Sequence, residues 1–142
     1  MATRWKSGLH HPVSVYAKQV TQGKLRDKCC KYEILACQRH LDDLKRQGTK
    51  DFPYVFDTTR ADRIIRWFKQ CVQVRGVYQG QPIEPQPWQI FDQGCLYGWV
   101  HMETGARRFI VSYNKRARGN LKSTENAAKC LYHMCADCYY PP

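Results

Sequence analysis

The sequence lacks any apolar run long enough to cross a membrane. A membrane-spanning helix needs about 18 or more consecutive apolar residues, and no such run occurs in the 142 residues. The basic N-terminus also lacks the apolar core of a signal peptide. These absences argue against a membrane-spanning or secreted protein and predict a cytoplasmic location. The eight cysteines are accordingly expected to be reduced thiols.

Acidic residues are scarce. There are 12 Asp and Glu against 23 Lys and Arg, which gives a formal net charge of +11. Such an excess favours a polyanionic partner, nucleic acid before an acidic membrane; the alternative is a basic domain whose charges are solvated. The charge is partly local, because six basic residues and no acidic one lie between Arg107 and Lys122. This clustering predicts a segment that faces phosphate groups.

Internal repeats and low-complexity tracts are absent too, which argues against a repeat protein or a disordered chain. At 43% hydrophobic and 13% aromatic residues, the chain is expected to fold as one domain. Apolar residues recur at helical spacing in several segments. We expect helices from about residue 13 to Gly23, from Lys28 to Gln47, from an N-cap at Thr59 to near Gly76, and from Pro87 to Gly98, with a connector at 49–57 and a possible short strand at Trp99–Met102.

The segment Arg107–Cys138 predicts a strand, a basic loop and a helix in that order. Phe109, Val111 and Tyr113 alternate with smaller or polar neighbours, as in a strand, and the Gly-Asn pair at 119–120 breaks the pattern. Helical spacing then follows in Ala127, Ala128, Leu131, Met134 and Cys135. This is the layout of a phosphate-binding loop, in which backbone N–H groups at a helix N-terminus face an anion.

The Walker A pattern G-x-x-x-x-G-K-[ST] would fall on Arg116–Ser123. Lys122 and Ser123 match it, whereas Arg116 and Leu121 occupy the two glycine positions. Glycine at the second position accepts a positive φ and lets the backbone approach a phosphate, and leucine does so only at a cost. Taken alone, this segment is therefore better interpreted as a basic surface loop before an amphipathic helix than as a nucleotide site.

Further motifs make the chain resemble the N-terminal part of the large terminase subunit of tailed phages, the ATPase that packages viral DNA. The resemblance runs over most of the chain and rests on the order and spacing of its pieces. They are Cys-Gln-Arg-His-Leu-Asp-Asp-Leu at 37–44, the apolar and aromatic helix at 64–71, Pro-Trp-Gln at 87–89, Tyr-Gly-Trp at 97–99, Thr-Gly-Ala-Arg-Arg-Phe at 104–109 and Arg-Gly-Asn-x-Lys-Ser at 118–123. Members of this family often lack the first Walker glycine and carry a basic residue inside the loop, as Arg118 does here.

The resemblance implies a site for ATP and Mg²⁺. Lys122 would contact the β- and γ-phosphates, Ser123 would bind Mg²⁺, and Arg118 would act catalytically on the charge of the transferred phosphoryl group. Gln89 would read the adenine, since an amide both donates and accepts. The implied nucleotide-binding residues are Gln89, Arg116, Arg118, Gly119, Asn120, Lys122, Ser123 and Thr124. Judged without the family, Gln89 would be a helix-surface glutamine and Arg118 a solvated charge or a DNA contact.

The predicted fold class is α/β, a helical N-terminal section followed by the first strand–loop–helix of a P-loop NTPase core. The divisions are a basic arm over 1–11, the helical section over 12–98 and the start of the core over 99–142. No apolar strand ending in acidic residues follows the loop, and no acidic cluster for a two-metal nuclease occurs. The domain is therefore expected to be incomplete, and the chain alone inactive.

Two functions remain open at this point. In the first, the chain is the N-terminal fragment of a terminase that binds ATP and Mg²⁺ to drive double-stranded DNA into the prohead. The resemblance then implies the portal protein and the terminase small subunit as further partners, a homo-oligomeric ring, and the host cell cytoplasm. In the second, the chain is a basic nucleic-acid-binding module with a degenerate, non-catalytic phosphate loop.

Overall fold

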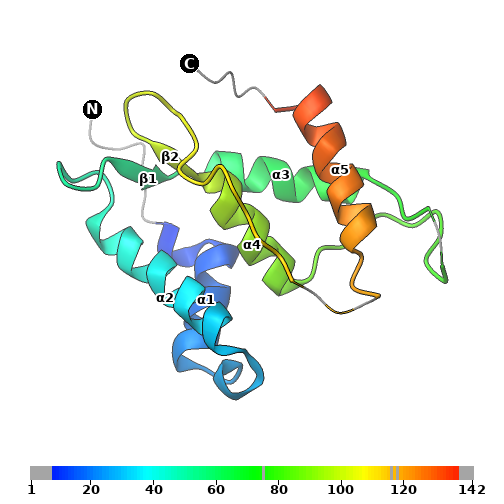
Figure 1. Ribbon diagram of the computed structural model, residues 1–142, viewed down its shortest axis with the longest axis horizontal. Helices are drawn as coiled ribbons and strands as arrows, with labels where there is room; N and C mark the ends of the chain where they lie inside the picture. The colour runs from blue at the N-terminus through cyan, green and yellow to red at the C-terminus, as the bar shows by residue number, and fades with distance from the viewer. Residues whose placement is uncertain (1–7, 75, 116, 118, 138–142) are drawn as a thin grey trace.

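The computed structural model describes residues 8–74, 76–115, 117 and 119–137. The elements in chain order are the 3-10 helix η1 (Gly8–His10), α1 (Pro12–Gln22), the 3-10 helix η2 (Arg26–Lys28), α2 (Lys31–Arg46), β1 (Tyr54–Phe56), α3 (Thr58–Gln70), α4 (Pro87–Gly98), β2 (Trp99–His101) and α5 (Lys122–Cys135). Helix α4 lies at the centre, with α1 and α2 on one side and α3 and α5 on the other (Figure 1). The predicted mixture of α and β structure is confirmed in this general form.

The sheet consists of two short strands that pair antiparallel, with Phe56 opposite Trp99. Strand β2 confirms the short strand predicted at Trp99–Met102, whereas β1 lies in the segment that we predicted to be a connector. Three residues are too few for an alternating pattern to be read, so β1 is recognised only through its partner. The aromatic residues of this segment pack on the core as expected, with Phe52 and Phe56 buried.

Local caps decide the helix boundaries. The helices α1, α2 and α4 agree with the predicted ones, and α4 begins at Pro87, where the missing N–H of proline costs nothing. Helix α3 is capped by Asp57 and not by Thr59, because Asp57 Oδ1 accepts a hydrogen bond from the Thr59 backbone N–H at 2.9 Å. The same helix ends at Gln70, earlier than the predicted end near Gly76.

The end of the predicted basic arm is folded. Residues 1–7 lie outside the described residues. Gly8 is buried, and a Cβ added to it would lie 2.6 Å from the Phe56 ring. His11 caps α1, since its Nδ1 accepts from the Val13 backbone N–H at 3.3 Å, and its Nε2 lies 3.1 Å from Asp62 of α3. The packed body therefore includes residues 8–11 as well as the predicted helical section.

The core forms two clusters that share α4. The first joins α1, α2 and the sheet, and the second joins α3, α4 and α5 through residues such as Phe68, Tyr97 and Tyr132. The central place of α4 requires glycine at two positions. A Cβ on Gly94 would lie 2.3 Å from Val13, so this glycine lets α1 pack directly on the α4 backbone. A Cβ on Gly98 would lie 2.6 Å from the Phe56 ring of β1.

His40 is the buried polar centre of the first cluster and is 2% exposed. Its Nδ1 accepts a hydrogen bond from the Trp99 indole N–H at 3.1 Å, so Nε2 carries the proton and donates to Ser14 Oγ at 2.9 Å. Burial lowers the pKa of His40 from 6.5 to about 4, although the nearby Asp43 carboxylate opposes this shift. The core therefore holds a neutral histidine.

We expect the free energy of unfolding to decrease as the pH falls from 6.5 towards 4. In this window the unfolded chain binds a proton at His40 that the folded protein does not bind, so acid favours unfolding. One unit of pKa difference is worth about 1.4 kcal/mol, so the total loss is about 3 kcal/mol. Urea unfolding at several pH values measures this loss of stability. In His40→Gln, the free energy of unfolding should no longer show this part of the pH dependence. An equal dependence of the free energy of unfolding on pH in the two proteins would contradict the role of His40.

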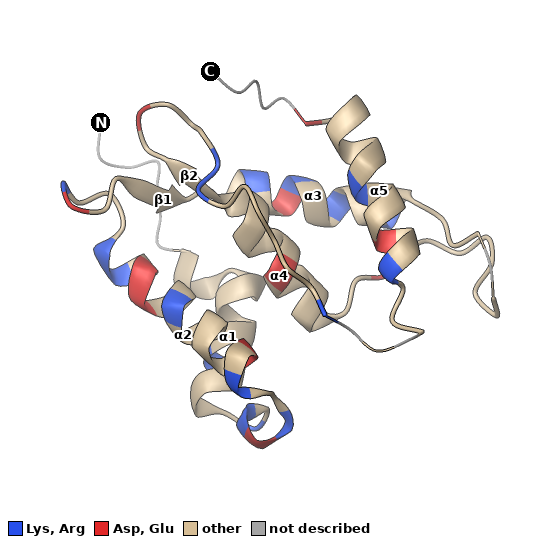
Figure 2. Ribbon diagram, in the orientation of Figure 1, with Lys and Arg blue, Asp and Glu red and all other residues tan. Residues whose placement is uncertain are grey.

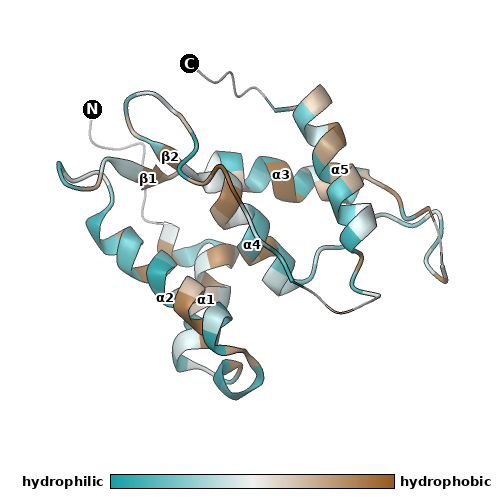
Figure 3. Ribbon diagram, in the orientation of Figure 1, coloured by the Kyte–Doolittle hydropathy of each residue, from teal (hydrophilic) through white to brown (hydrophobic). Residues whose placement is uncertain are grey.

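The strand predicted at residues 109–113 is not formed. After an isolated bridge between Val100 and Arg107 the chain is extended, and Ile110, Val111 and Tyr113 are 81–88% exposed. Figure 3 shows an apolar stretch on the segment that leaves β2. An alternating pattern becomes a strand only when a neighbouring strand shares its hydrogen bonds, and within the described residues no backbone hydrogen bond reaches 109–113.

Helix α5 begins at Lys122, as predicted, but it buries only part of the apolar set that recurs at helical spacing. The buried residues are Glu125, Ala128 and Tyr132. Leu131 and Met134 of that set are 50% and 81% exposed. The buried face therefore combines Ala128 with a glutamate, which the apolar residues alone do not indicate.

Candidate phosphate-binding site

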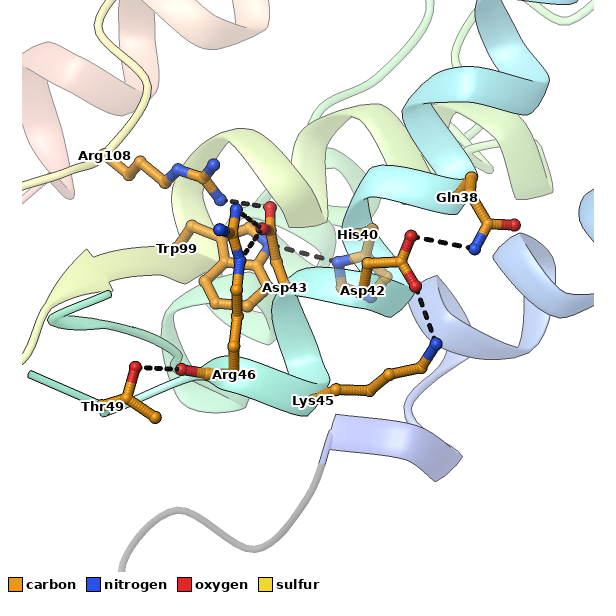
Figure 4. A network of polar contacts seen from close by, with 9 residues as sticks. All are labelled: Gln38, His40, Asp42, Asp43, Lys45, Arg46, Thr49, Trp99 and Arg108. Carbon is orange, nitrogen blue, oxygen red and sulfur yellow. Dashed lines mark hydrogen bonds and ion pairs between the residues drawn. The ribbon is translucent and has the colours of Figure 1, made fainter. Parts of the chain in front are cut away.

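Arg108 fixes the chain before it leaves for the predicted loop. Its guanidinium pairs with Asp43 of α2, which Arg46 also contacts at 2.6 Å (Figure 4). The Asp43 side chain is only 2% exposed. The Arg108 guanidinium also lies 4.7 Å from the centre of the Phe52 ring. One buried carboxylate thus ties the start of the segment to the N-terminal helices.

Arg107 binds the far end of α5. Its Nη2 lies 2.9 Å from Asp137 Oδ2, and the same oxygen lies 2.8 Å from His133 Nδ1. His133 Nε2 in turn lies 2.8 Å from the Tyr97 hydroxyl. The segment therefore starts beside the C-terminal end of α5 and leads to its N-terminal end, and a helix of 14 residues spans about 21 Å between the two. Of the predicted strand, loop and helix, the helix is formed and the strand is not.

The N-terminus of α5 presents backbone donors. The first hydrogen bond of the helix runs from the Glu125 N–H to the Leu121 carbonyl at 2.8 Å. The N–H groups of Ser123 and Thr124 therefore precede the helical hydrogen bonds, and Leu121 at the N-cap supplies no side-chain hydrogen bond. Together with the positive end of the helix dipole, such donors suit an anion.

Leu121 has a left-handed backbone. Its φ is 53° and its ψ is 20°, and among the described residues it is the only non-glycine residue with a positive φ. This conformation costs a residue with a side chain about 1 kcal/mol. Leu121 occupies the second glycine position of the Walker pattern, and Gly119, with φ 89°, precedes it by two residues. The leucine backbone therefore takes a conformation for which glycine is better suited.

The structure brings several predicted nucleotide-binding residues to one place. Exposed around the N-terminus of α5 are Gly119, Asn120, Lys122 and Ser123. Thr124 is half-buried in the first turn. Gln89 lies on α4 and reaches Glu125 of α5 at 3.0 Å. Arg116 and Arg118 lie outside the described residues.

Gln89 belongs to a buried polar cluster that sequence analysis missed. Its Oε1 accepts from the Gln86 backbone N–H at 2.8 Å, and its Nε2 donates to Glu125. Gln93 Nε2 donates to the other Glu125 oxygen at 2.7 Å, and Lys129 Nζ lies 2.9 Å from that oxygen. The amides and the ammonium compensate the buried carboxylate. The spacing of Gln89 and Gln93, four residues apart on one helical face, was the available signal. The predicted adenine contact of Gln89 stays a prediction.

A small cavity lies beside this cluster, between α3, α4 and α5. Its lining residues are Phe68, Ile83, Pro85, Gln89, Gln93, Leu121, Thr124 and Glu125. Leu121 and Thr124 flank Lys122 and Ser123 in sequence. The cavity therefore borders the same helix N-terminus that presents the backbone donors.

In the described part of the chain, no group of three or more His, Cys, Asp or Glu side chains is placed to hold a metal ion. No helix within those ranges is both long and apolar enough to cross a bilayer.

No known protein was found to be similar to this chain. Comparison of the chain with models of protein families, with curated proteins and with solved structures found no match. The likeness to terminases therefore rests on the sequence motifs alone.

Proposed function

We propose that the N-terminus of α5 binds the phosphates of ATP. The observation that carries the proposal is the left-handed backbone of Leu121, at the Walker glycine position directly before Lys122. Backbone outliers of this kind persist where the surrounding structure holds them, and they cluster at ligand sites. Within the described residues, no backbone hydrogen bond from the Ser123 or Thr124 N–H is found, which supports the same assignment.

The residues present fit a nucleotide with its metal ion. Lys122 and the backbone donors complement the charge of the phosphates, and the Ser123 hydroxyl is a suitable oxygen ligand for a phosphate-bound Mg²⁺. When bound, Mg·ATP supplies the reactive phosphoryl group. The residues of this chain bind and orient it, and Arg118 takes the catalytic role in this proposal.

For the parent protein we propose a DNA-packaging ATPase of which this chain is the N-terminal part. The order of the terminase-like motifs supports this, as does the net charge of +11. Figure 2 shows Lys and Arg along α3 and on α5 and the segment before it. Double-stranded DNA, the portal protein and the terminase small subunit are the partners of this proposal, in a ring of identical subunits. Residues 109–113 would then pair with further strands of a complete P-loop core.

A nucleic-acid-binding module without catalysis is the second candidate. Tyr113 is 88% exposed, and the exposed Lys115 lies two residues further along the same segment. An exposed aromatic ring next to a cation is suited to stacking on bases beside a phosphate backbone. On this view Lys122 contacts DNA and not ATP.

Leu121→Gly and Leu121→Ala separate backbone strain from side-chain packing. Both remove the leucine side chain from the cavity, but only glycine accepts a positive φ without cost. We expect the glycine variant to be more stable than the alanine variant by about 1 kcal/mol, measured by urea unfolding. Its affinity for ATP, measured by calorimetry, should equal or exceed that of the wild type. Equal stabilities, or a loss of ATP binding in Leu121→Gly, would count against the phosphate loop.

A further inference from the structure

Residues 109–113 form an exposed apolar segment on the stretch of chain that leads from β2 toward α5 (Figure 1). Ile110, Val111 and Tyr113 are 85%, 81% and 88% exposed. Within the described residues, no backbone hydrogen bond reaches this segment. Contiguous apolar side chains on an extended backbone with open hydrogen-bonding groups favour pairing with another chain. The segment is therefore a candidate interaction surface.

The start of the segment is fixed to the body of the protein. Arg107 Nη2 lies 2.9 Å from Asp137 Oδ2, and Arg108 pairs with the buried Asp43. The Arg108 guanidinium also lies 4.8 Å from the centre of the Phe109 ring. Because one end is anchored, the segment loses less conformational freedom when it pairs, which lowers the cost of binding.

The pattern of the segment is complementary to itself. Alternate residues of an extended chain share a face, and one face carries an aromatic residue, a valine and an aromatic residue, namely Phe109, Val111 and Tyr113. Antiparallel pairing centred on Val111 would place Phe109 of one copy opposite Tyr113 of the other, and Val111 opposite its own counterpart. Aromatic pairs of this kind stabilise neighbouring strands. A second copy of this chain therefore fits the segment.

The distribution of charge permits a second copy at this place, although the chain carries a net charge of +11. Residues 109–114 contain no charged side chain. In the register centred on Val111, Lys115 of one copy would lie opposite Arg107 of the other. Asp137 already balances the charge of that arginine. The two copies would therefore meet along an uncharged stretch whose ends do not place two unbalanced cations opposite each other.

We propose that two copies of this chain pair through residues 109–113 as antiparallel strands, around a two-fold axis at Val111. Burial of Ile110, Val111 and Tyr113 in both copies removes on the order of 1,000 Å² from water, at the low end of specific interfaces. The dimer is therefore weak and depends on concentration. A two-fold contact is closed, so it differs from the ring of the terminase proposal.

The inference is independent of the proposed nucleotide function. In the parent protein proposed above, further strands of a P-loop core would take the same edge of residues 109–113. In the chain of 142 residues, the second copy takes it. The α5 N-terminus takes no part in this contact.

Sedimentation equilibrium of the nuclease-treated chain over a range of concentrations measures the association. We expect a reversible equilibrium between monomer and dimer for the wild type. Val111→Asp places two like charges opposite each other at the axis, so it should raise the dimer dissociation constant at least about tenfold. Val77→Asp is the matched control and should leave the constant unchanged. Val77 is 94% exposed but lies in a turn outside the segment.

A mixture of two variants tests the register. Val111→Lys should also weaken the dimer, because two lysines then face each other. Since residue 111 faces its own counterpart, an equimolar mixture of Val111→Asp and Val111→Lys joins opposite charges. The mixture should dimerise at least about tenfold more tightly than either variant alone. Circular dichroism verifies the fold of each variant, which we expect to be unchanged because Val111 is exposed and lies outside the helices and strands.

Several results would overturn the inference. A wild-type chain that stays monomeric at every attainable concentration has no such contact. If it associates only before nuclease treatment, nucleic acid bridges the copies. Equal weakening by Val77→Asp and Val111→Asp would place the association elsewhere, and a mixture no tighter than its components would show that residue 111 does not face its counterpart. None of these results changes the expectation for ATP binding.

Discussion

Lys122→Ala is expected to weaken ATP binding by at least about tenfold and to leave the fold intact. Lys122 is exposed at the first residue of α5, and alanine is a good helix former, so the substitution suits the helix. A charge-assisted hydrogen bond to phosphate is worth about 1.5–3 kcal/mol, which corresponds to about 10- to 150-fold in affinity. If the chain is part of the DNA-packaging ATPase proposed above, the same change in that parent protein should abolish ATP-driven DNA packaging.

Lys115→Ala is the matched control. It removes an exposed lysine from the same basic segment but not from the α5 N-terminus. Calorimetric titration with Mg·ATP should show a loss for Lys122→Ala only. Titration with duplex DNA should show a modest loss for both variants, with a flatter salt dependence. If Lys122→Ala keeps its ATP affinity while its DNA affinity falls, the chain is the nucleic-acid-binding module and not the ATPase fragment.

The largest effect on stability is expected from Asp43→Ala, with a loss of about 3 kcal/mol in the free energy of unfolding. Asp43 is buried and shared by Arg46 and Arg108. Without it, the Arg108 guanidinium, only 16% exposed in its side chain, keeps its charge in a buried place with no anion. Removing one partner of a buried ion pair costs more than the pair itself contributes.

Asp42→Ala provides the comparison for this variant. Asp42 precedes Asp43 on α2 but points to solvent, where it contacts Lys45 and Gln38 (Figure 4). Its removal should have little effect, because exposed ion pairs contribute little. Urea unfolding of both variants at neutral pH makes the comparison. If the two variants lose equal stability, the Arg108 anchor does not hold the segment as described.

Helices with a continuous apolar stripe could be predicted from sequence. The stripe of α1 places Val13 and Val20 in the core as expected, and Pro87 marks the start of α4. The strand at 109–113 was predicted wrongly, because its apolar residues need a neighbouring strand that the described chain does not provide. Strand β1 was missed because pairing with β2, and not its own pattern, makes it a strand.

The candidate site was predictable in part. The start of α5 at Lys122 and the breaking Gly119–Asn120 pair are local features, so sequence indicated them. Glu125 and Gln93 form their contacts only because α4 and α5 pack together. The spacing of Gln89 and Gln93 on α4 could indicate a shared polar face, but not the buried carboxylate of α5 that they bind. The strained backbone of Leu121 was suggested by its place in the Walker pattern but could be seen only in the structure.

Backbone amide NMR of the isotope-labelled 16.7 kDa chain, titrated with Mg·ATP, tests the phosphate site most directly. The chain is small enough for each amide to be followed separately. We predict that the largest shifts occur at Gly119, Asn120 and Lys122–Thr124, and that inorganic triphosphate reproduces them. Saturable shifts elsewhere, or none at these amides at any ATP concentration, would contradict the proposal that the α5 N-terminus binds a nucleotide.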